Sequence, residues 1–81
     1  MKYLTLFYQG NTIEIHHTHW GKESIYYNGK LMSARRSFFG STHHFQVKED
    51  KEEAKYEIGI GYNSNGIALR IYRNEAPILI Q

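Results

Sequence analysis

The stretch SIYYNGKLMSARRS, residues 24–37, decides the fold. At its centre lies the pair Asn28-Gly29, and both residues tolerate the positive φ angles that a two-residue hairpin turn requires. This pair is the strongest short-range signal for a β-hairpin. The stretch therefore predicts two antiparallel strands, residues 24–27 and 30–37, joined by a tight turn.

Further strands are predicted on both sides of this hairpin. In residues 12–18 isoleucines alternate with polar residues, which is the two-residue period of a strand with one buried face. Similar patterns between turn signals identify the segments 3–8, 43–49, 55–62, 67–73 and 78–80. The sequence thus predicts an all-β fold, an antiparallel β-sandwich of about eight short strands that forms a single domain over residues 1–81.

Length and composition restrict how this domain is stabilised and what it binds. The chain has 81 residues, no cysteine and 41% hydrophobic residues, so apolar packing rather than disulfides or a cysteine zinc site must hold it together. The net charge is only +2. Nucleic-acid binding is therefore not expected, because such proteins concentrate many more cations on one face.

The N-terminal residues begin with a lysine and an apolar run, as a signal peptide does. The run is interrupted by Thr5 and Tyr8 and lacks a cleavage site with small residues. No stretch reaches the roughly 20 apolar residues of a membrane-spanning helix. We therefore expect a soluble cytoplasmic protein that does not bind membranes, a location that also suits the absence of cysteine.

The segment GKESIYYNGK, residues 21–30, resembles a motif of the Fas apoptotic inhibitory molecule family. That motif reads Gly-Lys-x-x-(Ile/Val)-Tyr-x-(Asp/Asn)-Gly-Lys, and the resemblance extends over about residues 12–47. It implies a compact antiparallel β-sandwich that acts as a non-enzymatic interaction domain, with no catalytic residues to transfer. The matching positions in this chain are Gly21, Lys22, Ile25, Tyr26, Asn28, Gly29 and Lys30.

Histidines are the candidate metal ligands of this sequence. His17 and His19 are two residues apart, so within one strand their side chains would point to the same side. His43 could join them if its strand lay alongside, and three neutral imidazoles can bind zinc, nickel or copper. A histidine-based site for a divalent metal is therefore an alternative function, although no metal or other cofactor is required by the sequence.

Catalysis finds little support in the sequence. A hydrolytic triad needs a carboxylate that orients its base, but the only aspartate, Asp50, lies in a turn among like charges. Ser41 lies closest to a histidine pair, but no nucleophile elbow presents it. We therefore predict that the protein is not an enzyme.

The remaining candidate is a surface for binding other molecules. Aromatic and basic residues gather around the hairpin, and the predicted interaction strip consists of Trp20, Lys22, Tyr26, Arg35 and Phe38. The same ingredients could stack single-stranded nucleic acid, which is a second alternative function. Strand 3–8 is apolar on both faces, which favours self-association. We predict a non-catalytic interaction module for a protein partner or for a second copy of the chain.

Overall fold

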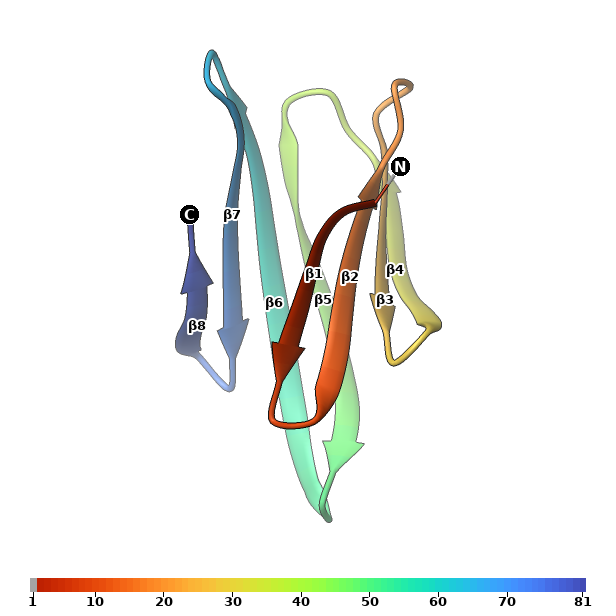
Figure 1. The fold of residues 1–81 in the computed structure, drawn as a ribbon, viewed down its shortest axis with the longest axis vertical. Coiled ribbons are helices and arrows are strands. Elements are labelled where there is room, and N and C mark those ends of the chain that lie inside the picture. The colour runs from red at the N-terminus through yellow and green to blue at the C-terminus, as the bar shows by residue number, and fades with distance from the viewer. Residues whose placement is uncertain (1) are drawn as a thin grey trace. The chain divides into compact units, whose positions relative to one another are not determined.

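The computed structural model describes residues 2–81, which form eight strands and no helix. Every strand pairs antiparallel with the next one along the chain, and two four-stranded sheets result, β1-β2-β3-β4 and β5-β6-β7-β8 (Figure 1). The predicted all-β antiparallel fold of about eight short strands is confirmed. The strands are β1 Lys2–Tyr8, β2 Asn11–His17, β3 Lys22–Tyr27, β4 Lys30–Arg36, β5 Gly40–Glu49, β6 Glu52–Asn63, β7 Gly66–Arg73 and β8 Ala76–Ile80.

The chain divides into two compact units, and each unit contains one sheet. The first unit is residues 1–38 and the second is residues 39–81. The division of the strands into two antiparallel sheets, which a β-sandwich requires, is thereby confirmed. The expectation of one domain over residues 1–81 stays a prediction.

Four of the turns between strands consist of two residues that both have positive φ. Their angles, near +50° and then +70° to +80°, are those of the turn type that matches the twist of a β-hairpin. Only two of the four contain glycine, so the other two hold side chains in the left-handed region. The four turns are Gln9-Gly10, Asn28-Gly29, Asp50-Lys51 and Asn74-Glu75.

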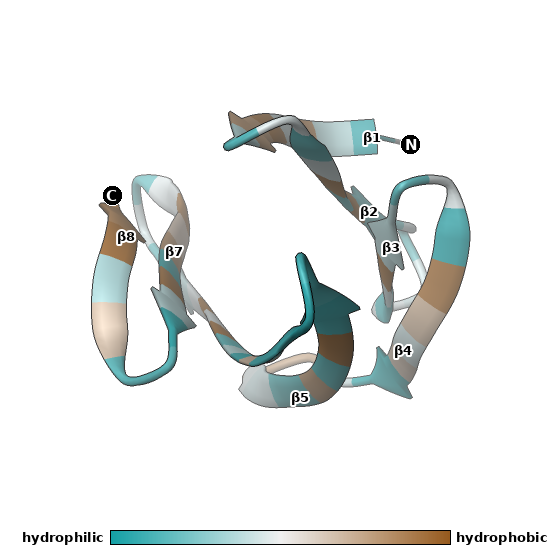
Figure 2. Cartoon of the chain, turned by 90° about the horizontal axis from the view of Figure 1, so that it is seen from below, coloured by the Kyte–Doolittle hydropathy of each residue, from teal (hydrophilic) through white to brown (hydrophobic). Residues whose placement is uncertain are grey.

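One face of each sheet is lined by buried apolar side chains. Alternation along the strands produces this face, and brown and teal bands along β5 show it in Figure 2. Each large aliphatic or phenylalanine side chain in this face stabilises the fold by roughly 1.5–3 kcal/mol relative to an exposed position. The first sheet buries Ile13, Ile15, Ile25 and Tyr27, and the second buries Phe45, Ala54, Tyr56, Ile58, Ile60, Leu69 and Ile71.

The two sheets share one plan at the level of single residues. The sequence Ile-Tyr-x-Asn occurs at residues 25–28 in β3 and its turn, and again at residues 71–74 in β7 and its turn. In both places the pairing with the next strand shifts between the isoleucine and the tyrosine. The strand before carries Glu-Ile in the same register, as Glu14-Ile15 in β2 and Glu57-Ile58 in β6.

The asparagine of each repeat connects its turn to a third strand. The side-chain Oδ1 of Asn28 accepts a hydrogen bond from the Thr12 backbone amide at 2.8 Å. The backbone amide of Asn28 donates a second one to the Thr12 carbonyl, also at 2.8 Å. Asn74 makes the same two bonds with Lys55, at 2.9 Å and 2.8 Å. The chain is therefore an internal repeat of a four-stranded meander, a feature that the sequence patterns did not reveal.

Candidate interaction surface

In the turn between β2 and β3, a hydrogen bond between Thr18 and Lys22 closes a loop of residues 19–21 that presents two side chains to solvent. The Thr18 amide donates to the Lys22 carbonyl at 3.0 Å, and the Gly21 amide donates to the Thr18 carbonyl at 3.1 Å. Gly21 has a φ of +77°, as the last loop residue of such a hairpin requires. His19 and Trp20 occupy the tip of the loop and are exposed.

Phe38 lies directly over this turn. A Cβ atom at Gly21 would lie 2.9 Å from Cε1 of Phe38 and 2.9 Å from the Ser37 carbonyl oxygen, so only glycine fits. The Ser37 amide also donates to the Gly21 carbonyl at 2.8 Å, which ties the end of β4 to the turn. The Phe38 ring therefore lies beside Gly21, between Trp20 and Lys22 in the chain.

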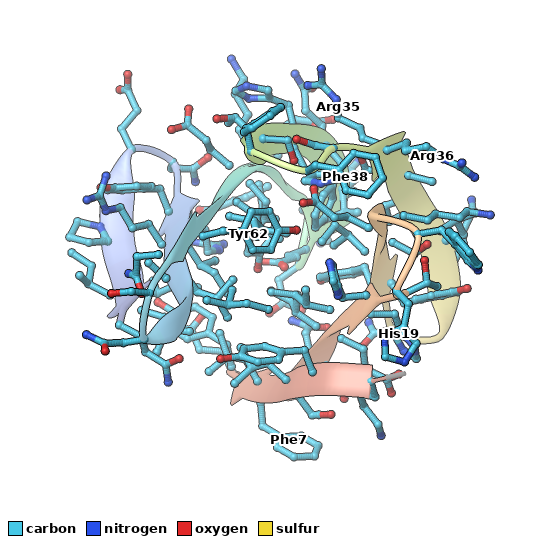
Figure 3. All side chains as sticks on the ribbon, turned by 90° about the horizontal axis from the view of Figure 1, so that it is seen from above. Phe7, His19, Arg35, Arg36, Phe38 and Tyr62 are labelled. Carbon is cyan, nitrogen blue, oxygen red and sulfur yellow. The ribbon has the colours of Figure 1, made fainter. Side chains whose placement is uncertain are left out.

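Two cations face each other next to the turn. Lys22 begins β3 and lies in register with Arg36 at the end of β4, and both side chains are exposed. Arg35 lies in register with the buried Glu23 instead, on the other face of the sheet. Figure 3 labels Arg35 and Arg36, whose side chains leave β4 in different directions.

We define the turn surface as Trp20, Lys22, Arg36 and Phe38. Three of these residues belong to the predicted interaction strip. Arg36 takes the place of Arg35, because the shift in the β3–β4 pairing between Ile25 and Tyr26 places Arg36 on the same face as Lys22. The Trp20 and Phe38 side chains are 75% and 62% exposed. The surface therefore combines two accessible aromatic rings with two cations at one end of the first sheet.

The predicted strip also included Tyr26, which lies farther along β3 and is half-buried. Its ring makes an edge-on contact with the His16 imidazole, with 4.9 Å between the ring centroids. His16 in turn lies 3.0 Å from Oε1 of Glu14, and this hydrogen bond is the main cause that lowers the pKa of the Glu14 carboxyl. Tyr26 thus belongs to a polar cluster in the middle of the sheet.

The three candidate metal ligands have different surroundings. His17 lies in register with the buried Glu23, His19 is exposed at the tip of the turn, and His43 is buried in β5. Figure 3 labels His19 at the turn. Residues 2–81 contain no group of three or more histidine, cysteine, aspartate or glutamate side chains placed to hold a metal ion.

Ser41, which the sequence places next to a histidine pair, is within hydrogen-bond distance of His43. Side chains two residues apart lie on the same face of a strand, and here the serine Oγ is 3.1 Å from Nε2 of His43. The cross-strand neighbours of the pair are Ile60 and Ile58. The hydroxyl therefore supplies a hydrogen-bond partner to an imidazole that is only 1% exposed.

Glu49 organises a second polar contact, at one end of the second sheet. Its Oε1 accepts hydrogen bonds from Nε and Nη2 of Arg73 at 2.9 Å and 2.7 Å, and its Oε2 accepts one from the Tyr56 hydroxyl at 2.7 Å. The bonds to Glu49 raise the pKa of the Arg73 guanidinium. All partners are satisfied within the sheet, so this ion pair is structural.

Two open hollows lie on the polar face of the second sheet, with volumes of about 610 Å³ and about 430 Å³. The larger hollow mixes both signs of charge, since Lys55 lines it together with Glu57 and Glu75. The smaller one lies over Gly59 and Gly61 in β6. The smaller hollow is also lined by the exposed Phe39 and by Arg70, so it offers one ring and one cation, whereas the turn surface combines two rings with two cations.

Residues 2–81 contain no helix long and apolar enough to cross a membrane. No protein-family model matches the sequence, and searches of curated proteins and of solved structures found no match either.

Proposed function

We propose that the protein is a non-catalytic interaction module that binds an acidic segment of a protein partner through the turn surface. The observation that carries this proposal is the pairing of Lys22 directly opposite Arg36. Like charges on neighbouring strands destabilise a sheet, and neither cation forms an ion pair with any residue between 2 and 81. A carboxylate of a partner placed between them would form ion pairs with both and reduce their mutual repulsion.

The aromatic residues of the turn surface supply the apolar part of the contact. Tryptophan and arginine are enriched among residues that dominate binding energies, and exposed aromatic rings bury large areas when a partner binds. The Phe38 ring lies against Gly21, which places it next to Trp20 and Lys22 in the turn surface. The surface is therefore suited to a segment that alternates acidic and apolar side chains.

A protein partner is favoured over a nucleic acid because the turn surface holds only two cations. Proteins that bind nucleic acids without sequence preference contact many phosphates along a basic groove. The resemblance to the Fas apoptotic inhibitory molecule family, which implies an interaction domain without catalysis, also supports a protein partner. A cytoplasmic location remains part of this proposal.

Fluorescence anisotropy with a short labelled peptide of glutamate and leucine tests the proposal. Lys22→Glu and Arg36→Glu should each weaken binding at least about tenfold, which corresponds to about 1.4 kcal/mol. Lys30→Glu is the matched control because Lys30 is exposed at the other end of the same hairpin, beside the Asn28-Gly29 turn. It carries the same change of charge and should leave the affinity nearly unchanged.

Two results would overturn the proposal. An equal loss in Lys30→Glu would show that only net charge matters, and the turn surface would have no special role. Tighter binding of a labelled oligothymidylate than of the acidic peptide, with the same dependence on Lys22, would assign the surface to nucleic acid.

A further inference from the structure

Four strands lie at the edges of the two sheets, β1 and β4 in the first and β5 and β8 in the second. An edge strand exposes unpaired backbone groups, and proteins protect such edges with charges, prolines, irregular pairing or short length. β4 carries three cations and a shift in its pairing. β8 has five residues and contains Pro77.

The remaining edge of the second sheet, β5, is polar on its outward face. His44, Gln46 and Lys48 all lie on this face and are exposed. β1 differs from β4 and β5 because most of its residues are apolar, and its one charge, Lys2, and its shift in pairing both lie at its N-terminal end. β8 is apolar throughout as well, but it is shorter, and Pro77 removes a backbone N–H. Phe7 of β1 pairs with Thr12, and Gln46 of β5 pairs with Lys55. Because Thr12 and Lys55 occupy the same position in the internal repeat, Phe7 and Gln46 do so as well.

The apolar residues of β1 are accessible on the face opposite the buried one. Phe7 is 77% exposed and Tyr3 is 42% exposed. Figure 3 shows the Phe7 ring projecting away from the β1 ribbon. On the other face, Leu4 and Leu6 lie in register with Ile15 and Ile13 of β2.

The register determines which backbone groups of β1 point away from β2. The two-residue turn Gln9-Gly10 makes Tyr8 and Asn11 a hydrogen-bonded pair, and such pairs alternate with non-hydrogen-bonded ones along antiparallel strands. Thr5 and Phe7 therefore form non-hydrogen-bonded pairs with β2. Their N–H and C=O groups are directed to the side of β1 that no strand of the first sheet occupies.

We propose that β1 pairs antiparallel with β1 of a second copy of the chain, so that the two first sheets join into one. In the register centred on Leu6, Thr5 exchanges hydrogen bonds with Phe7 of the second copy. Leu6 then faces Leu6 of the second copy, and Leu4 faces Tyr8. This surface is separate from the turn surface and does not depend on its function.

The charges on the edge strands favour β1 over β4 as the self-pairing strand. Lys2 is the only charged residue of β1 and lies at its N-terminal end, so in an antiparallel pair the two lysines lie at opposite ends and do not repel each other. The corresponding self-pairing of β4 would place Lys30 opposite Arg36 of the second copy. Like charges in that position are destabilising.

Sedimentation velocity of the full chain over a range of concentrations tests this pairing. The wild-type protein should show a monomer–dimer equilibrium. Thr5→Pro removes only an N–H that points away from β2, as prolines on edge strands do, and should raise the dimer Kd at least about tenfold. Gln46→Pro is the control, because Gln46 also forms a non-hydrogen-bonded pair with the neighbouring strand, so its N–H likewise points away from β6 on the β5 edge.

Circular dichroism checks that the variants retain their strands. Phe7→Lys provides a second variant that keeps every backbone donor and adds a charge to the edge. It should also weaken the dimer. A wild-type protein that stays monomeric at every concentration would overturn the proposal. A dimer that persists in Phe7→Lys and Thr5→Pro, or that Gln46→Pro disrupts equally, would assign self-association to another surface.

Discussion

Gly21 shows how one residue shapes the turn surface, because it combines a φ of +77° with a contact that leaves no room for a Cβ atom. Gly21→Ala should therefore destabilise the fold by about 1–3 kcal/mol, through strain in the left-handed region and displacement of Phe38. Chemical denaturation measures this loss. The fluorescence of Trp20, the only tryptophan, should report the altered turn in the native state.

Gly61→Ala serves as the control for this prediction. Gly61 lies inside β6 without a positive φ, and a Cβ atom there would meet nothing within 4 Å. Because glycine is costly inside a strand, this variant should be as stable as the wild type or more stable. Equal destabilisation by both substitutions would show that the fit at Gly21 is not the cause.

Glu14 makes one contribution to stability depend on pH. The hydrogen bond from His16 lowers its pKa in the folded state below the ordinary 4.5, so the carboxylate stabilises the fold above that pH. The contribution should disappear as the pH falls through the lowered pKa. Unfolding of wild type and Glu14→Gln across acidic pH should show curves that differ near neutrality and converge in acid.

A constant difference between the two Glu14 curves over the whole range would contradict this assignment. His16→Phe provides a second check, because it keeps a ring against Tyr26 and removes the hydrogen bond to Glu14. It should bring the titration of Glu14 back toward its ordinary value.

At the scale of elements, the two asparagine turns carry the most specific contacts. Asn28→Ala and Asn74→Ala each place alanine at a φ of +49° and remove the acceptor for a backbone amide of the third strand. Each substitution should cost about 1–3 kcal/mol of unfolding free energy. Thermal and urea denaturation measure the loss.

Asn65→Ala is the comparison for the asparagine turns. Asn65 lies in the turn between β6 and β7 and is exposed, and only its backbone amide takes part in the turn's hydrogen bond to Asn63. It should change the stability by less than about 0.5 kcal/mol. If Asn65→Ala were as damaging as Asn28→Ala, the contact with the third strand would not explain the effect.

The strands were largely predictable from sequence because alternation and turn residues are local signals. The Asn28-Gly29 turn follows directly from its sequence, whereas the charged turn 50–53 and the turn 74–77 that the sequence suggests are longer than the two-residue turns Asp50-Lys51 and Asn74-Glu75 of the structure. The choice between Arg35 and Arg36 could not be predicted. It depends on an extra residue in β4, which reverses the faces of all residues beyond it.

The candidate site was only partly predictable for a similar reason. Trp20 and Lys22 are neighbours in sequence and could be grouped from composition. The position of Phe38 over Gly21 depends on how β4 returns past the turn, and no local pattern encodes it. The hydrogen bond between Ser41 and His43 could have been found from their spacing, because residues two apart share a face.

For the whole molecule, the internal repeat separates the residues that both sheets need for folding from those that occur in only one sheet. The Ile-Tyr-x-Asn segments and the Glu-Ile pairs occur in both sheets and serve packing and turns. The turn surface occurs in only one of them. The equivalent turn of the second sheet carries Ser64 and Asn65 where the first carries exposed His19 and Trp20.

Because the first sheet alone carries the aromatic and basic turn, binding should be confined to one end of one unit. The attraction between exposed cations and carboxylates is screened by salt, so affinity for the acidic peptide should fall as ionic strength rises. Anisotropy titrations at several salt concentrations measure this dependence. A salt-independent affinity would show that Lys22 and Arg36 do not contribute.

The most direct test of the central claim is an NMR titration of the isotope-labelled chain with the glutamate–leucine peptide. We expect saturable shifts in residues 18–22 and 36–38, together with the indole of Trp20, and little change in β5 to β8. Shifts centred on the second sheet, or no saturable shifts at all, would contradict the assignment of the turn surface as a binding site.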